Sequence, residues 1–440
     1  MTKPKRQMRL GGFFHPTGNH VAAWLHPEAQ ADAGMNFRHY VELAQTSERA
    51  KFDLVFLADS NATRDGNVAA LSRWPQYMAY FEPTTLLSGL AATTKNIGLV
   101  ATATTSYNEP YTIARRFASI DMMSEGRAGW NVVTSSNKSE AYNYNRTEHF
   151  GHDERYERAR EFVEICRGLW DSWDDDAFVR DRETSTYFVP EKLHYLRHQG
   201  KHFSVRGPLN VPRPPQGYPV FAQAGASNTG RDFAAEIAEI VFTPLHTLKE
   251  AQDFSADIRG RMDKFDRDPS HIKIMPGLNV IVGRTDEEAE EKHQYLQSLI
   301  HPDVGRQLLS TELGGIDLTP FRVDGPLPYH LIPDVEGSSG KRIMDVARRD
   351  NLTIRDSYKQ FAGARGQRTL KGKPQHIADE MEDWFLKEGV DGFLIQPAHL
   401  PVGLNEFVDT VVPELVRRGR FKTKYEGKTL RENLGLPRPT

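Results

Sequence analysis

The sequence predicts an α/β protein, a (β/α)8 TIM barrel with long excursions after several strands. Short apolar, β-branched runs alternate with longer amphipathic stretches, a pattern typical of parallel βα units. Eight such runs occur along the 440 residues, and an α/β barrel of this length can form one domain. The first run leads into GGFFHPTGNH, which lacks the glycine fingerprint of an open nucleotide-binding sheet. These observations favour a closed barrel.

The predicted strands are short apolar runs, and the predicted helices carry apolar residues at three- and four-residue spacing. The strands span Met8–Phe14, Asp53–Ala58, Ile97–Ala103, Ala128–Val133, Pro219–Ala222, Ile240–Thr243, Ile272–Val282 and Gly392–Gln396. The helices span Phe37–Lys51, Pro83–Thr94, Pro110–Ser124, Glu154–Trp173, Asn228–Ala238, Leu248–Lys264 and Asn405–Arg418. Each helix can therefore cover the sheet with one face.

Three polar, Pro- and Gly-rich or irregular stretches interrupt this order, near residues 60–82, 174–217 and 284–388. As linkers between domains they would be ordinary, whereas after barrel strands they would build walls over the active-site face. We expect the second arrangement, with residues 1–440 forming a single barrel domain. The third stretch is basic and carries His301, Arg306, Arg322, His330, Lys341 and Arg342. This charge suits an anionic or polar substrate, and it suits a solvated surface equally well.

The composition excludes several classes of protein. The 56 Lys and Arg nearly balance the 59 Asp and Glu, and no basic stripe stands out, so neither nucleic acid nor an anionic membrane is expected as the main partner. No run of eighteen apolar residues occurs, and the N-terminus lacks the apolar core of a signal peptide. We therefore expect a cytoplasmic protein. Cys166, the single cysteine, lies in an apolar rhythm and is expected to be buried.

Polar side chains follow the predicted strands at the end where a barrel places its active site. They are Asp59 after the second strand, Thr102, Thr104 and Thr105 at the third, Asn131 and Ser135 at the fourth, and Gln223 to Ser227 after the fifth. The scattered histidines show no metal-ligand spacing, no serine lies in a GxSxG elbow, and Asp59 has no carboxylate partner. We therefore predict no metal site. Hydroxyls and amides with few charges suit an organic cofactor.

Two predicted helix starts could bind a phosphate. His152 and Tyr156 share one face of a first helical turn, where free N–H groups favour an anion. Gly225 and Ser227 open another helix with small residues and a hydroxyl. Alternatively, Ser227 and Asp153 are simple N-caps and Tyr156 is a surface aromatic, and the residues alone leave the two interpretations equal. The RYERARE run is interpreted as a mostly solvated face.

Structural roles compete with function at three more positions. Asp59 could merely cap the excursion after its strand, which is the usual role of a single Asp there. His20 and Trp24 could pack the barrel mouth without reacting. The residues alone do not separate these alternatives.

Five longer motifs occur together: FLADS at 56–60, ATATTSYNEPYTIARRFASIDMMSEGRAGWNVVTS at 101–135, HDERYERAREFVEICRGLWDSW at 152–173, GKHFSVRGPLNVPRPPQGYPVFAQAGASNTGRDFAA at 200–235, and TLRENLGLP at 429–437. In this combination the chain resembles the bacterial-luciferase-like flavin monooxygenases. The branch it resembles contains nitrilotriacetate monooxygenase component A, dibenzothiophene-sulfone monooxygenase and long-chain alkane monooxygenase. The resemblance runs nearly from end to end.

This resemblance implies an oxygenase component that receives reduced FMN from a separate NAD(P)H:flavin reductase. Such an enzyme transfers one atom of O2 to a small organic substrate through a flavin peroxide, and the other atom leaves as water. The family's cofactor site corresponds to Asp59 near the isoalloxazine, Thr102, Thr104 and Thr105 beneath it, Asn131 and Ser135 beside the ribityl chain, and His152, Tyr156, Ala226 and Ser227 toward the phosphate. His20 is implied as catalytic, and Phe14 and Trp24 as substrate-pocket residues.

The resemblance also implies a homodimer or homotetramer, and it leaves the substrate open. Two other functions remain as alternatives. A deazaflavin-dependent dehydrogenase of the same superfamily would use no oxygen, and the NVVTS and HDERY motifs weigh against it. A non-catalytic flavin-binding barrel would bind cofactor without turnover.

Overall fold

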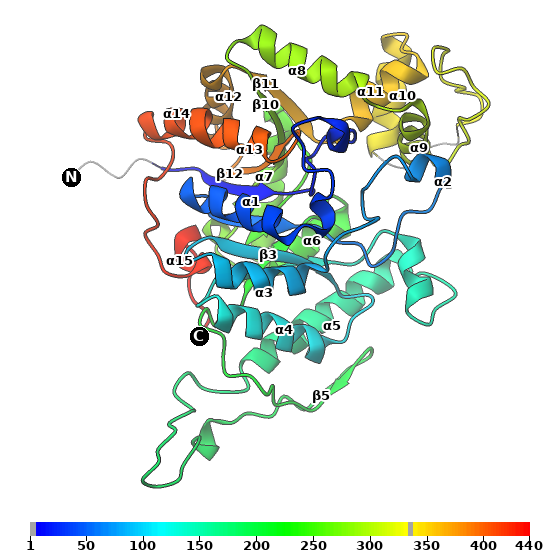
Figure 1. The fold of residues 1–440 in the computed structure, drawn as a ribbon. Coiled ribbons are helices and arrows are strands. Elements are labelled where there is room, and N and C mark those ends of the chain that lie inside the picture. Colours follow the sequence, from blue (N-terminus) through cyan, green and yellow to red (C-terminus); the bar gives the residue numbers. More distant parts are fainter. Residues whose placement is uncertain (1–5, 333–337) are drawn as a thin grey trace.

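A sheet of ten parallel strands forms the centre of the molecule, and helices surround it (Figure 1). The computed structural model describes residues 6–332 and 338–440. Residues 1–5 and 333–337, which belong to the predicted domain and its third excursion, lie outside the described residues. The strand order is β11-β10-β12-β1-β2-β3-β4-β7-β8-β9. The sheet closes because Asp391 N donates to Ile274 O and Leu394 N donates to Pro276 O, both at 2.9 Å. The predicted (β/α)8 barrel is thereby confirmed.

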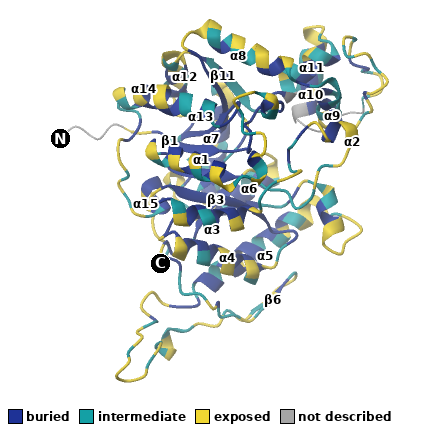
Figure 2. Cartoon of the chain, in the orientation of Figure 1, coloured by how far each residue is buried: buried dark blue, intermediate teal, exposed yellow. Residues whose placement is uncertain are grey.

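The strands are short and almost wholly buried. They span β1 (Arg9–Phe13), β2 (Leu54–Leu57), β3 (Gly98–Thr104), β4 (Ala128–Val133), β7 (Val220–Gln223), β8 (Ile240–Val241), β9 (Lys273–Ile274), β10 (Gly277–Val282), β11 (Arg368–Gly372) and β12 (Gly392–Pro397). A separate antiparallel pair consists of β5 (His198–Gln199) and β6 (Ser204–Val205). Figure 2 shows the contrast between the buried strands and the half-exposed helices around them.

The strand predicted over residues 272–282 is divided into two strands in the structure. Residues 272–282 form β9, which pairs with β8, and β10, which pairs with β11 and β12. Pro276 lies between them and has no N–H to donate, so the ladder toward β8 ends there. β10 is then free to pair with β11, a strand that the sequence analysis did not identify.

The helices of the barrel layer follow the predicted ranges within a few residues. They are α1 (Phe37–Arg49), α3 (Pro83–Thr93), α4 (Pro110–Met123), α5 (His152–Trp170), α6 (Asn228–Ile237) and α7 (Leu248–Met262). Between β12 and the C-terminus lie α13 (Val402–Glu406), a π-helical segment (Phe407–Val411), α14 (Val412–Arg417) and α15 (Leu430–Leu434). Short 3-10 turns span Ala23–Leu25, Ala33–Met35, Lys138–Asn143, Pro190–Lys192, Asp263–Phe265 and Pro269–His271.

Two of the three excursions follow strands. Residues 60–82 come after β2 and contain α2 (Val68–Leu71). Residues 284–388 come after β10 and contain α8 (Asp286–Ser298), α9 (Pro302–Glu312), α10 (Ser338–Arg349), α11 (Ile354–Ala362), β11 and α12 (Pro374–Leu386). This third stretch is therefore largely helical, and it has an apolar cluster of its own around Leu313, Ile354 and Tyr358.

The remaining excursion, residues 174–217, follows helix α5 instead of a strand. It therefore starts at the end of the barrel opposite the carboxyl ends of the strands, and it reaches away from the barrel as an arm (Figure 1, green). Arg213 anchors this arm to Asp171 at 3.0 Å. The arm accordingly does not contribute to the wall of the cavity described below.

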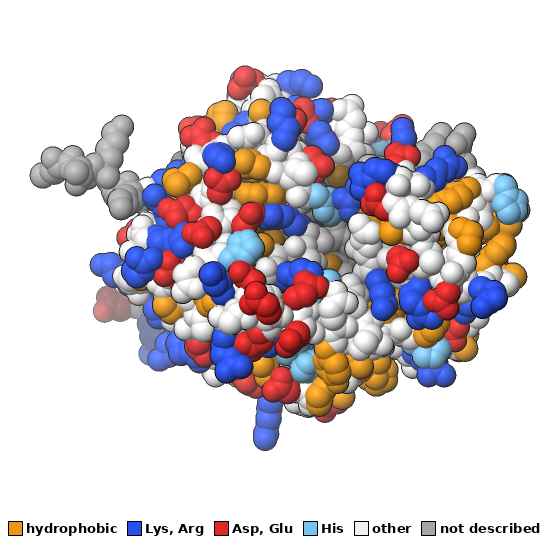
Figure 3. Space-filling model, turned by 90° about the horizontal axis from the view of Figure 1, so that it is seen from above, with side chains coloured by type: hydrophobic (Ala, Val, Ile, Leu, Met, Phe, Trp, Pro, Cys, Tyr) orange, Lys and Arg blue, Asp and Glu red, His pale blue; other side chains and the backbone are white. Residues whose placement is uncertain are grey.

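The outer surface shows no single dominant charge. Lys and Arg side chains mix with Asp and Glu over the face in Figure 3, and that face is hollowed near its middle. Within residues 6–332 and 338–440, no helix combines the length and the apolar character that crossing a membrane requires. The mixed surface agrees with the small net charge of −3.

Helix α15 closes the barrel at the amino ends of its strands. Leu430 and Leu434 are fully buried and belong to the cluster that fills the barrel interior, together with Phe56 and Val100. A Cβ on Gly98, the first residue of β3, would lie 2.4 Å from Leu430 Cδ1, so glycine leaves the room that this leucine occupies. The last helix of the chain is therefore part of the core.

We expect Leu430→Ala to lower the free energy of unfolding by about 2–5 kcal/mol, because it removes buried methyl groups and leaves a cavity in the barrel floor. Urea denaturation followed by tryptophan fluorescence measures the change. Leu386→Ala is the matched control, since Leu386 is 50% exposed at the end of α12. Equal effects of the two substitutions would contradict the role of α15 as part of the core.

Candidate active site

A cavity of about 390 Å³ opens at the carboxyl ends of β2, β3, β4 and β7. Its lining is mostly polar and includes Asp59, Ser60, Asn61, Arg64, Tyr77, Thr102, Thr104, Thr134, Ser135, Asn137, Glu140, His152, Arg155, Tyr156, Gln223 and Gly225. Six of the predicted cofactor residues are in this set, namely Asp59, Thr102, Thr104, Ser135, His152 and Tyr156. The position follows from the parallel sheet, which places all these strand ends at one face.

Asn131 lies next to the lining. Its Nδ2 donates to Thr102 Oγ1 at 2.8 Å, whereas its buried Oδ1 has no hydrogen-bond partner among the described residues. Such an orphaned acceptor at a cavity is a position for a ligand donor. Asn131 can therefore both orient Thr102 and accept a hydrogen bond from a bound group.

The hydroxyls at the ends of β3 and β4 form one network. Ser135 Oγ lies 2.7 Å from Thr104 Oγ1 and 2.6 Å from Glu140 Oε2. Ser135 has a φ of 56°, a left-handed conformation that is uncommon for serine and that occurs at functional sites. The network fixes the direction of the Ser135 hydroxyl at the cavity wall.

One end of the cavity has the features of a phosphate site. Helix α5 begins at His152, and its N-cap is Gly151, which has no side chain to satisfy the N–H groups of the first turn. Tyr156 is 8% exposed and packs edge-on against Phe233 of α6, with ring centroids 5.8 Å apart. The alternative of Tyr156 as a surface aromatic is therefore wrong. Free N–H groups and a positive dipole end favour an anion here.

Tyr156 and Ser227 border the same small space. A Cβ on Gly230 would lie 2.9 Å from Tyr156 Oη and 3.1 Å from Ser227 Oγ, so the absence of a side chain at Gly230 keeps this space open. Ser227 is the N-cap of α6, and its Oγ accepts from Gly230 N at 3.1 Å. The capping interpretation of Ser227 is thus confirmed, and the hydroxyl proton remains available for a ligand.

Seven predicted site residues are not in the cavity lining. Two of them, Asn131 and Ser227, are described above, and the other five are Phe14, His20, Trp24, Thr105 and Ala226. Thr105 Oγ1 donates to Val133 O at 3.3 Å, Phe14 packs in the hydrophobic core, and Trp24 Nε1 donates to Arg73 O at 3.1 Å. The Ala226 carbonyl accepts from Arg231 Nε at 3.0 Å. These contacts give each of the four a structural role.

His20 faces the third excursion. Its Nδ1 accepts from Ala22 N at 3.2 Å, and its buried Nε2 has no hydrogen-bond partner among the described residues. Burial, with His293 nearby, lowers the pKa of His20 to about 3, so the imidazole is neutral at physiological pH. A Cβ on Gly363 would lie 3.2 Å from Nε2. The catalytic role of His20 stays a prediction.

Four charged or aromatic residues of the lining were not predicted from the sequence, namely Arg64, Tyr77, Glu140 and Arg155. Arg155 belongs to the run interpreted as a solvated helix face, yet its Nη1 donates to Thr134 O at 3.3 Å and to Ser135 O. Arg64 and Tyr77 lie in the first excursion, where no periodic pattern marks a position as internal. The rim is therefore more charged than expected.

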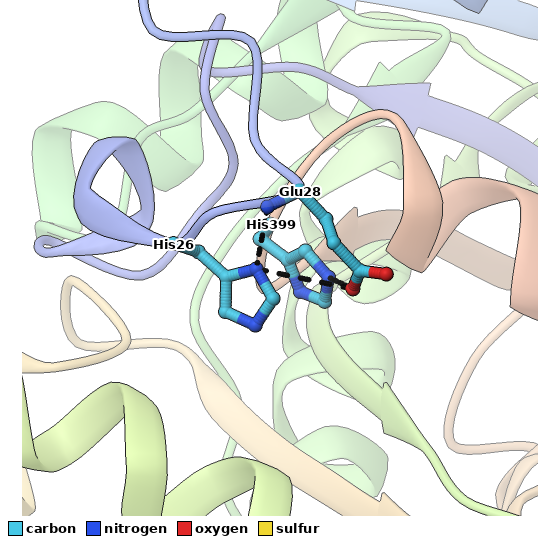
Figure 4. Close-up of side chains that lie close together, drawn as sticks. All are labelled: His26, Glu28 and His399. Atoms are coloured by element: carbon cyan, nitrogen blue, oxygen red, sulfur yellow. Dashed lines mark hydrogen bonds and ion pairs between the residues drawn. The ribbon is translucent and has the colours of Figure 1, made fainter.

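A group of possible metal ligands, His26, Glu28 and His399, also lies outside the cavity lining (Figure 4). His26 Nδ1 and His399 Nε2 are each 4.0 Å from Glu28 Oε2. The lone pair of His26 Nδ1 is already used, because it accepts from Glu28 N at 3.2 Å. Burial lowers the pKa of both histidines, and the nearby Lys292 ammonium contributes in the same direction, so a cation at this group would lie close to another positive charge. We assign this group no metal.

A parallel barrel with a hydroxyl-lined cavity at the carboxyl ends of its strands, and with two helix N-termini at one end of that cavity, is the arrangement of an enzyme whose site suits an anionic organic cofactor. The chain belongs to the luciferase-like monooxygenases, whose family model matches residues 11–392. It is therefore a flavin-dependent monooxygenase.

Individual relatives resemble the chain over nearly its whole length. It is 50% identical to N-acetyl-S-(2-succino)cysteine monooxygenase of Bacillus subtilis, over 100% of this chain and 99% of the relative. It is 48% identical to nitrilotriacetate monooxygenase component A of Aminobacter aminovorans, over 99% and 97%. The crystal structure of long-chain alkane monooxygenase (LadA) superposes with a TM-score of 0.85 at 34% identity, over 99% and 96%. This similarity confirms the predicted family branch.

The pKa of Asp59 provides a test of how far this carboxyl is shielded from water. Burial, together with Glu82 and Glu140, raises the pKa of Asp59 to about 7, whereas an unfolded Asp titrates near ~4. Between these values the folded chain holds a proton that the unfolded chain has released, so the free energy of unfolding falls as the pH rises. We expect calorimetry from about pH 5 to 8 to show wild type losing stability relative to Asp59→Asn. Parallel profiles for the two proteins would contradict the burial of this carboxyl.

Proposed function

We propose that the chain is the oxygenase component of a two-component system, which uses reduced FMN and O2 to oxygenate a small organic substrate. The observation that carries this proposal is the cavity, where a free helix N-terminus and two hydroxyls surround one open space. Family membership supports the flavin chemistry. The family alone does not fix the substrate, since relatives are named for compounds as different as nitrilotriacetate and long-chain alkanes.

The residues present fit FMN. The phosphate is dianionic or nearly so, and His152, Arg155, Tyr156 and Ser227 offer donors for it beside the start of α5. The orphaned Oδ1 of Asn131 and the Ser135 hydroxyl suit the polar ribityl chain and ring edge. When bound in its reduced form, the flavin supplies the electrons and the site of oxygen activation.

The chain's own residues bind and orient the cofactor and exclude water from it. Thr102 is held by Asn131, and Thr104 and Ser135 hold each other, so these groups are ordered before any ligand binds. Asp59, with its raised pKa, is protonated below about pH 7 and can then donate a hydrogen bond instead of placing a negative charge in the cavity. Preordered dipoles in a dry cavity protect reactive species from water.

The electrons require a second protein. The sequence contains no glycine fingerprint for a nicotinamide dinucleotide, so we propose a separate NAD(P)H:flavin reductase as the source of reduced FMN. We expect the chain alone to oxidise NADPH negligibly, and to form a product 16 mass units heavier once a reductase and FMN are added. NADPH oxidation by the chain alone, at the rate of product formation, would contradict the two-component proposal.

The phosphate end gives a sharper test. Tyr156→Phe and Ser227→Ala each remove a donor to a charged group, which contributes on the order of 1.5–3 kcal/mol, or roughly one to two decades of affinity. We expect both variants to bind FMN more weakly and riboflavin almost as wild type does, measured by flavin fluorescence titration.

Tyr142→Phe is the matched control, since Tyr142 is 64% exposed. It should bind both flavins unchanged. Equal losses of FMN and riboflavin affinity in the Tyr156 and Ser227 variants would argue against a phosphate site and for local misfolding.

A further inference from the structure

Two arginines from distant parts of the chain lie in the same region, and one of them, Arg64, lines the cavity. Arg64 follows β2 and lines the cavity, with its guanidinium carbon 5.0 Å from the centre of the Tyr77 ring. Arg365 precedes β11, and its Nε donates to Asn19 O at 2.9 Å. Its guanidinium carbon lies 5.7 Å from the Trp74 ring. The two cations are close enough that Arg64, after burial, contributes to the lowered pKa of Arg365.

No carboxylate of the described residues neutralises this pair. Neither Arg64 nor Arg365 forms an ion pair with any residue in the described part of the chain. Asp59 does not serve, because the charges that add to its raised pKa are those of Glu82 and Glu140, with no arginine among the causes. Glu140 is bound to Ser60 and Ser135, at 3.0 and 2.6 Å. Both guanidinium groups therefore lack an ion-pair partner in the described part of the chain, and that of Arg64 lies in the cavity lining.

The unused donors of these residues are buried. Arg64 Nε, Arg365 Nη1 and Trp74 Nε1 have no hydrogen-bond partner within residues 6–332 and 338–440, and all three can only donate. His15 Nδ1, also buried and without a partner there, lies close enough that both arginines help to lower the pKa of His15, after burial. Buried donor atoms without partners destabilise a fold, and Arg64 lines the cavity, so these atoms point to a ligand that supplies the missing acceptors.

The anion that fits is not the cofactor phosphate. Arg64, Arg365 and His15 come from the segments after β2, before β11 and after β1, whereas the phosphate donors follow β4 and β7. A planar guanidinium binds a carboxylate through two parallel N–H···O bonds, and a second guanidinium can donate to the lone pairs of the carboxylate that remain. Tyr77 forms the adjoining wall of the cavity.

We propose that Arg64 and Arg365 form a carboxylate subsite, so that the substrates are small organic acids oxygenated at an atom away from the bound carboxylate. This inference rests on the proposed monooxygenase function. It names Arg64 and Arg365 as specificity-determining residues, and Tyr77, Trp74 and His15 as the walls of the subsite.

The experiment compares each acid with its neutral ester. Thiodiglycolate and nitrilotriacetate, their methyl esters, and the sulfonate analogue of thiodiglycolate are titrated calorimetrically into the flavin-free chain and then assayed for product with FMN, reductase and O2. We expect at least one acid to bind ten-fold or more tighter than its ester and than the sulfonate. Binding of no acid, or equal binding of acid and ester, would overturn the proposal, and tighter binding of the sulfonate would overturn the carboxylate assignment.

Two variants and a control separate this role from a structural one. Arg64→Gln and Arg365→Gln should weaken acid binding ten- to hundred-fold, leave FMN affinity unchanged and raise the thermal midpoint of the ligand-free chain, because an uncompensated charge is removed. Arg73→Gln, at an exposed arginine of the same excursion, should change none of these. Loss of FMN affinity would assign the arginines to the cofactor phosphate, and a lowered midpoint would assign them to the fold; both results overturn the proposal.

Failure of the monooxygenase function is separately visible. A chain that binds neither FMN nor reduced FMN would refute the proposed function, whatever the acids do. A chain that binds reduced FMN and consumes O2 but ignores every acid in the panel would refute only the carboxylate subsite.

Discussion

The architecture of the catalytic face depends on one proline in the seventh barrel strand. Pro276 cannot donate a backbone hydrogen bond, so the strand that begins as β9 beside β8 continues as β10 beside β12 and gains β11 on its other side. The third excursion returns to the sheet at β11. The register of β11 on β10 therefore also fixes the position of the segment that precedes β11. Arg365 lies in that segment, three residues ahead of β11. Backbone pairing thus places a charged side chain beside the segment after β1, where its Nε donates to Asn19 O.

The two ends of the barrel differ in how completely their charged side chains are hydrogen-bonded. At the amino ends of the strands, Arg127 is 3% exposed and fully engaged: its Nε donates to Ser124 O at 2.7 Å and its Nη1 to Ile97 O at 2.8 Å. Lys422 pairs with Asp53 in the same region. At the carboxyl ends, Arg64 Nε and Arg365 Nη1 are buried and lack such partners among the described residues. Stability is concentrated at one end, and unsatisfied polar groups at the end that binds ligands.

Much of the fold could be predicted from the sequence because buried parallel strands leave continuous apolar runs, such as Ala128–Val133, which is β4 as predicted. Residues at strand tips were predictable for the same reason, and Thr102, Thr104 and Ser135 lie at the cavity. Arg64 and Tyr77 were not predictable, because their excursion has no period that separates inside from outside. Arg155 was misinterpreted, since a polar helical position reads as solvated unless a cavity faces it.

The position of α15 has a consequence for biosynthesis. Leu430 and Leu434 complete the barrel interior, yet they are synthesised after every strand of the sheet. Until they leave the ribosome, the amino ends of the strands enclose an open apolar space lined by residues such as Val100 and Leu394. Nascent chains with exposed apolar surface are the ones that chaperones bind. Completion of this barrel therefore waits until residues 430–434 have been synthesised, and a chain cut before them lacks its floor.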